Sequence, residues 1–172
     1  IVVVLVIALV QGVLLRGLSN VVNSAFSLQN NETRVRVEQP LIPERSGSPE
    51  SLAPWDTLGF EGRNFVAGGL SAEEISEGLD RPAREPIRAY AGLETAATQD
   101  GRLDIVVAEL ERTGAFERAA LVVVPTTGTG WVNPTAITAE ELLFAGDVAT
   151  VATQYSYLPS WISFLAEREK AA

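Results

Sequence analysis

Apolar and polar positions follow two different periods in the second half of the chain. Residues 86–92 partly alternate apolar and polar side chains and include an aromatic residue, which is typical of a strand. After them, apolar residues fall at positions i, i+3, i+4 and i+7, which predicts a helix with one buried stripe that ends before Gly114. The stripe consists of Leu103, Val106, Val107 and Leu110. Residues 119–124 are apolar on both alternating faces and predict a central parallel strand that helices cover on either side.

Two capping boxes predict where further helices begin. Ser71 is followed three residues later by Glu74, and Thr138 by Glu141, so that each pair can satisfy free N–H groups of a first turn. The apolar pairs at the positions of a hydrophobic staple are Leu70 with Ile75 and Ile137 with Leu142. The second helix leads into a strand at residues 148–155. The order β-α-β-α-β predicts an α/β fold with a mostly parallel sheet and flanking helices.

The first fifteen residues differ from the rest of the chain. Residues 1–15 carry no charge, whereas the 13 basic and 22 acidic residues all lie from Arg16 onward. Fifteen helical residues cover roughly 22 Å of a hydrocarbon core of roughly 30 Å, so we expect the C-terminal part of a transmembrane helix with its other turns upstream. The alternative is a buried strand or a core helix. A polar linker or arm is expected at 16–58, and the ordered domain at 59–172.

This division makes the lipid bilayer the first predicted partner, through residues 1–15. We therefore expect an integral protein of the cell membrane. The basic residues closest to the apolar segment are Arg16, Arg34 and Arg36, too few for the positive-inside rule to fix an orientation. An acidic domain on the extracytoplasmic side is the preferred arrangement.

Charge and composition exclude several other functions. The net charge of −9 argues against nucleic-acid binding, because affinity for phosphates comes from Lys and Arg. The chain has no Cys and no His, which removes thiolate catalysis and argues against a zinc site, so no cofactor and no metal is predicted. Six carboxylates fall on helix starts or polar helix faces, where we expect solvated groups without acid-base chemistry. They are Glu73, Glu74, Glu109, Glu111, Glu140 and Glu141.

The loops that follow two of the predicted strands are the candidate ligand sites, because ligands of open α/β sheets bind beyond the carboxyl ends of the strands. The first loop, residues 126–131, has three threonines and two glycines, which let backbone N–H groups approach an anion or a developing oxyanion. Trp131 can wall such a pocket. Alternatively, the glycines only make a tight turn and the tryptophan fills the core. The loop lacks both G-x-G-x-x-G and a following G-K-S/T, so the nucleotide-loop patterns fail.

The second loop, residues 154–161, combines hydrogen-bonding and aromatic side chains and is suited to holding a ligand, although a packed surface loop has the same composition. The pocket-lining candidates are Trp131, Gln154, Tyr155, Ser156 and Tyr157. Neither Ser156 nor Ser160 lies in a G-x-S-x-G elbow, and no imidazole in the chain can activate them, so neither is predicted to be a nucleophile.

Five blocks of the sequence resemble, in the same order, the bacterial (actinobacterial-type) integral-membrane α/β-hydrolase family 9. The blocks are residues 63–69, 85–94, 108–116, 127–132 and 154–161. The resemblance covers roughly residues 1–168. It implies a membrane region followed by a partial α/β-hydrolase fold, in a fragment that ends before the nucleophile elbow. It also implies that the loop after residue 124 contributes an oxyanion N–H, for which Thr127, Gly128 and Thr129 are the candidates.

The predicted function is therefore that of a membrane-anchored α/β-hydrolase-like protein. In the full-length chain it is expected to hydrolyse an ester or acyl substrate through a serine, whereas residues 1–172 alone lack nucleophile and His and are expected to be inactive. The alternative is a non-enzymatic, membrane-tethered module that binds a ligand or a partner. A reading frame that continues past residue 172 into G-x-S-x-G and a later His would separate the two hypotheses.

Overall fold

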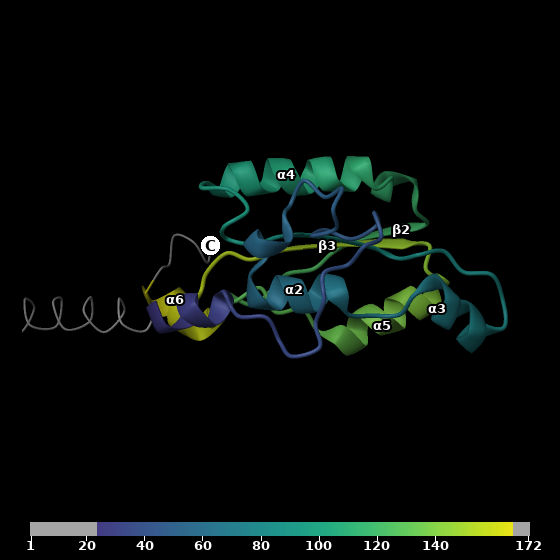
Figure 1. Cartoon of the computed structure of the whole chain (residues 1–172), viewed down its shortest axis with the longest axis horizontal. Helices are drawn as coiled ribbons and strands as arrows, with labels where there is room; N and C mark the ends of the chain where they lie inside the picture. Colours follow the sequence, from purple (N-terminus) through teal and green to yellow (C-terminus); the bar gives the residue numbers. More distant parts are fainter. Residues whose placement is uncertain (1–23, 167–172) are drawn as a thin grey trace, which may run out of the picture.

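The computed structural model describes residues 24–166, in which three strands form one parallel sheet (Figure 1). The strands are β1 (Ile87–Ala91), β2 (Ala120–Val123) and β3 (Val148–Thr153), in the order β1-β3-β2. In the register, Val151 of β3 pairs with Ala89 of β1 and with Val123 of β2. The predicted mostly parallel sheet is confirmed.

Helices cover both faces of this sheet (Figure 1). One face carries α4 (Gln99–Arg112), which connects β1 to β2, and the other carries α5 (Pro134–Leu143), which connects β2 to β3. The second connection runs back across the sheet, so right-handed crossovers are expected to place the two helices on opposite faces. The remaining helices are η1 (Trp55–Thr57), α2 (Gly59–Ala67), α3 (Ala72–Leu79), η2 (Ala115–Glu117) and α6 (Ser160–Ala166).

The core is divided by the sheet into two apolar clusters. Ile87, Ala89 and Ala91 of β1 pack toward Val106 and Leu110 of α4. The cluster on the α2 and α5 side consists of Ala53, Leu58, Phe65, Val66, Tyr90, Val132, Ile137 and Ala152. Alternate residues of β1 thus serve opposite faces, as the pleat of a strand requires.

The prediction that residues 119–124 form the central strand is wrong. Among the described residues β2 pairs only with β3, and Val123 is 74% exposed. The central position belongs to β3, which is buried along nearly its whole length. It tolerates a threonine there because the Thr150 hydroxyl donates to the Glu140 carboxylate. Apolar composition therefore did not distinguish the edge strand from the central one.

The capping box at Ser71 is confirmed at the start of α3. The hydroxyl of Ser71 accepts from the N–H of Glu74 at 3.2 Å, and the Glu74 carboxylate accepts from the N–H of Ser71 at 2.8 Å. In α4 the predicted stripe is only half buried, since Val106 and Leu110 lie in the core but Leu103 is 44% exposed. Only the side of the stripe that contains Val106 and Leu110 therefore packs on the sheet.

The second capping box, at Thr138, is wrong because the N-cap of α5 is Asn133, five residues earlier. Asn133 caps that helix, with its side-chain oxygen accepting from the N–H groups of Thr135 and Ala136, and Pro134 occupies the first turn. A proline there costs no hydrogen bond and is preorganised for helix. Glu141 then falls in the last turn of α5, where its side chain is buried.

Part of the predicted polar arm lies against the sheet. The N–H of Arg88 donates to the carbonyl oxygen of Glu44 at 3.0 Å, and the N–H of Ser46 donates to the carbonyl oxygen of Arg88 at 3.0 Å. These bonds satisfy backbone groups along the free side of β1. The transmembrane prediction for residues 1–15 lies outside the described residues, and within 24–166 no helix is long and apolar enough to cross a membrane.

Candidate functional site

The loops after β2 and β3 lie side by side at the carboxyl edge of the sheet. The Thr126 hydroxyl donates to the carbonyl oxygen of Thr153 at 2.7 Å. One step further out, the N–H of Ser156 donates to the carbonyl oxygen of Gly128 at 2.9 Å, and the Gly128 N–H donates to the Ser160 Oγ at 3.0 Å. Two segments separated by about a helix and a strand in sequence thus form one structural unit.

The three oxyanion candidates have different hydrogen bonds. The N–H of Thr127 donates back across the turn to the carbonyl oxygen of Trp131 at 3.4 Å, so it is directed into the loop. The Gly128 N–H is taken by the Ser160 hydroxyl, a side chain that can rotate away. In the part of the chain that the structure describes, no group accepts from the N–H of Thr129. Thr129, with Gly128 beside it, is therefore the available donor.

Both glycines of the first loop are needed for close contacts. A Cβ on Gly128 would lie 2.1 Å from the carbonyl oxygen of Leu158, in the neighbouring loop. Gly130 has a φ of 85°, and a Cβ there would lie 1.9 Å from the Tyr90 hydroxyl, which donates to the Gly130 carbonyl oxygen. Only glycine fits at these two sites. The close contacts that result fix the N–H groups of the loop, but a tight turn without a binding role would require glycine as well.

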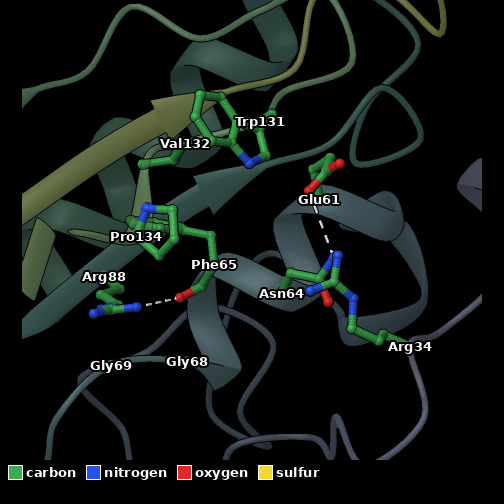
Figure 2. A pocket seen from close by; sticks show the side chains of 10 residues that line it. All are labelled: Arg34, Glu61, Asn64, Phe65, Gly68, Gly69, Arg88, Trp131, Val132 and Pro134. Atoms are coloured by element: carbon green, nitrogen blue, oxygen red, sulfur yellow. Dashed lines mark hydrogen bonds between the residues drawn. The ribbon is translucent and has the colours of Figure 1, made fainter. Parts of the chain in front are cut away.

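Two of the pocket-lining candidates face cavities. Trp131, 44% exposed, lines a cavity of about 130 Å³ together with residues of α2 (Figure 2). We call this cavity the Glu61 hollow, and the residues used below are Arg34, Glu61, Asn64, Phe65, Trp131 and Val132. Tyr157 and Thr129 line a smaller cavity of about 40 Å³, which also includes Glu61.

The other candidates mainly hold the second loop together. Gln154 is 2% exposed, and its amide donates to the Asn30 side chain at 3.0 Å and to the carbonyl oxygen of Ser156 at 3.1 Å. The buried Ser156 hydroxyl accepts from the N–H of Leu158. The Tyr155 hydroxyl donates to the Ser160 Oγ at 3.3 Å.

Glu61 was missed by the sequence analysis, although it borders both cavities. It lies in the first turn of α2, in a segment whose glycines and aromatics indicated only where the domain begins. Burial raises the pKa of Glu61 above its usual value, and the Asn64 amide and the charge of Arg34 oppose that rise. A carboxylate placed between glycines and aromatic residues was the signal available in the sequence.

Comparison with protein families shows to which family this chain belongs. The model described as the alpha/beta-hydrolase family matches residues 87–172, half of the chain, and the model described as the N-terminus of that family matches residues 1–69. The chain belongs to the alpha/beta-hydrolase family. No curated protein and no solved structure matches it.

The family match covers all three strands and both loops of this alpha/beta-hydrolase chain. The resemblance found in the sequence is thereby confirmed at the level of the family. The 172 residues contain no His and no Cys, so the Ser-His pair of a hydrolase triad is not complete within them. Among residues 24–166 no group of acidic side chains is arranged to hold a metal ion.

Two carboxylates of this alpha/beta-hydrolase chain are buried, against the prediction that they are solvated. Glu109 is fully buried and accepts from the hydroxyls of Ser46 and Ser51 and from the N–H of Leu52, at 2.6–2.9 Å. Glu141 is fully buried as well and is paired with Arg88. The helical pattern of the sequence placed both glutamates on polar helix faces. It could not show that they are buried, because Ser46, Ser51 and Arg88, which bind them, lie far away in sequence.

Proposed function

We propose that this chain forms the N-terminal half of the catalytic domain of a membrane-anchored serine hydrolase that acts on an ester or acyl substrate. The observation that carries the proposal is the N–H of Thr129, for which residues 24–166 provide no acceptor and which lies beside Gly128 at the carboxyl edge of the parallel sheet. The family match supports the hydrolase class. The apolar residues 1–15 support the anchor.

In this proposal the loop after β2 supplies one donor for the oxyanion. Attack on the substrate carbonyl places negative charge on its oxygen, and a fixed backbone N–H stabilises that charge without reorganisation. A second donor comes from the residue after the nucleophile in enzymes of this class. The proposal assigns the nucleophile and the His to residues other than these 172, since these include no imidazole that could activate a serine.

A serine-directed probe tests this function. The protein extended beyond Ala172, purified in detergent, is expected to react covalently with a fluorophosphonate and to hydrolyse a p-nitrophenyl ester. Residues 1–172 alone are expected to remain unlabelled, because no base activates their serines. An extended protein that folds but shows neither labelling nor turnover overturns the proposal in favour of a membrane-tethered binding module.

Gly128→Ala is expected to lower kcat of the extended protein by about a hundredfold or more, the loss typical of a displaced oxyanion donor. The added Cβ would meet the Leu158 carbonyl oxygen at 2.1 Å and displace the loop that carries the N–H of Thr129. The rate of ester hydrolysis at saturating substrate concentration measures this kcat.

The matched control is Gly78→Ala, in α3, where an added Cβ meets nothing within 4 Å. It is expected to leave kcat unchanged and to stabilise the helix slightly. Equal kcat values for the two variants, with both proteins folded, would contradict the assignment of the loop.

A further inference from the structure

The Glu61 hollow carries polar groups that the fold itself does not use. Figure 2 shows Glu61 and Asn64 on α2 facing Trp131 across the cavity, with Arg34 at its side. Phe65 and Val132, both buried, form an apolar part of the lining. The cavity therefore combines an aromatic wall with planar polar side chains, and its volume of about 130 Å³ is comparable to that of one small ring.

Asn64 holds the clearest unused group. Its side-chain oxygen is buried and has no hydrogen-bond partner among the described residues. Its amide nitrogen donates to the Glu61 carboxylate only over a long distance of 3.5 Å. A buried acceptor without a donor is costly, so a turn of the Asn64 amide that brings this oxygen to the cavity surface, where a ligand can donate to it, is favoured.

Charge balance limits the kind of ligand. Glu61 is an acceptor, and Arg34, which interacts with it electrostatically, supplies donors and the opposite charge. The Arg34 guanidinium lies 5.5 Å from the centre of the Phe60 ring, which holds it near the cavity. A cation would be repelled by Arg34 and an anion by Glu61. A hydroxyl group both donates and accepts, and it suits this mixed set.

We propose that the Glu61 hollow binds a neutral ring bearing adjacent hydroxyl groups, such as a pyranose or a cyclitol. One ring hydroxyl donates to the Glu61 carboxylate and another to the Asn64 side-chain oxygen, one of them also accepts from Arg34, and the apolar face of the ring packs on Trp131. The residues that line this cavity lie between 34 and 134, and the site does not depend on the proposed hydrolysis.

Titration of the full chain in detergent, followed by ligand-observed NMR, tests the site. The neutral probes are methyl α-glucoside, methyl α-mannoside, methyl α-galactoside and myo-inositol, and the charged probes are acetate and tetramethylammonium. At least one neutral probe is expected to saturate with a Kd of roughly 1–10 mM, as for a small ligand with few contacts. No saturation by a neutral probe up to about 100 mM, or tighter binding of a charged probe, overturns the proposal.

Three variants locate the binding. Trp131→Ala and Glu61→Gln are each expected to raise the Kd of the neutral probe about tenfold. The first removes the surface on which the ring packs, and the second removes a charged acceptor. Trp161→Ala is the matched control, because Trp161 is 69% exposed and lies outside the lining of the hollow. It is expected to leave the Kd unchanged.

Thermal unfolding of each variant shows that it is folded, so that a lost fold is not mistaken for a lost site. Binding that is unaffected by both Trp131→Ala and Glu61→Gln in folded protein overturns the proposal. Because binding is read without turnover, this result is independent of whether the extended protein hydrolyses esters.

Discussion

Replacing Glu141 by Leu is expected to lower the free energy of unfolding by about 3–5 kcal/mol, because it leaves the buried Arg88 without its counter-charge. The Arg88 side chain meets the Glu141 carboxylate through two nitrogens, Nε at 2.8 Å and Nη2 at 2.9 Å. Both side chains are almost fully buried. Burial raises the pKa of Glu141 and lowers that of Arg88, which reflects the cost of keeping two charges there.

The double variant Arg88→Met, Glu141→Leu separates a stranded charge from lost packing. It is expected to recover most of the stability lost by Glu141→Leu, since apolar residues can replace a buried ion pair at little cost. Recovery is incomplete because Arg88 also donates to the carbonyl oxygen of Phe65 at 2.6 Å. Urea unfolding of the full chain in detergent measures all three proteins.

Asp147→Ala is the control for an ion pair at the surface. Arg84 and Asp147 are 2.8 Å apart, but their side chains are 55% and 34% exposed. Water screens this pair, and a loss of at most about 1 kcal/mol is expected. A loss for Glu141→Leu no larger than that of Asp147→Ala would contradict the role assigned to the buried pair.

The parts of the fold that the sequence predicted are those decided by neighbours along the chain. The capping box at Ser71 needs only Glu74, three residues away, and it forms as predicted. At Thr138 the same pattern failed because Asn133 and Pro134 begin the helix earlier, and because Glu141 is drawn to Arg88 from a distant strand. Local signals therefore compete, and a tertiary ion pair can decide between them.

The order of the strands and the contents of the candidate site depend on contacts that no local pattern contains. β2 is wholly apolar whereas β3 contains two threonines, and yet β3 is the central strand, so composition does not say which one is central. That the two loops meet was predictable, because parallel strands end at the same edge of a sheet. The place of Glu61 was not, since α2 approaches Trp131 across about seventy residues of intervening chain.

Glu109→Gln is the second variant for which a large loss of stability is expected, about 3 kcal/mol at neutral pH, because the Glu109 carboxylate is buried among five donors. Besides Ser46, Ser51 and the N–H of Leu52, the donors are two nitrogens of Arg112, at 2.9 and 3.1 Å. A glutamine amide carries no charge and turns its own N–H₂ group toward donors. The segment before α2 then loses its anchor to α4.

This loss is also expected to depend on pH. Burial by itself would raise the pKa of Glu109, but the hydrogen bonds from Arg112, Leu52, Ser46 and Ser51 together outweigh it, so the pKa is lowered. The unfolded chain, with a Glu pKa of about 4.3, therefore takes up the proton first. The contribution of the carboxylate is complete above that pH and declines as the pH falls through it toward the folded pKa.

Unfolding free energies of the wild-type and Glu109→Gln chains, measured from pH 7 down to about pH 3, should accordingly converge at the acidic end. Glu111→Gln, an exposed neighbour on α4, is the control and is expected to change stability by less than about 0.5 kcal/mol at pH 7. A difference between wild type and Glu109→Gln that stays constant across this range would mean that the shape of the side chain, and not its negative charge, joins the segment before α2 to α4. Convergence would identify the ionised carboxylate as the group that holds it.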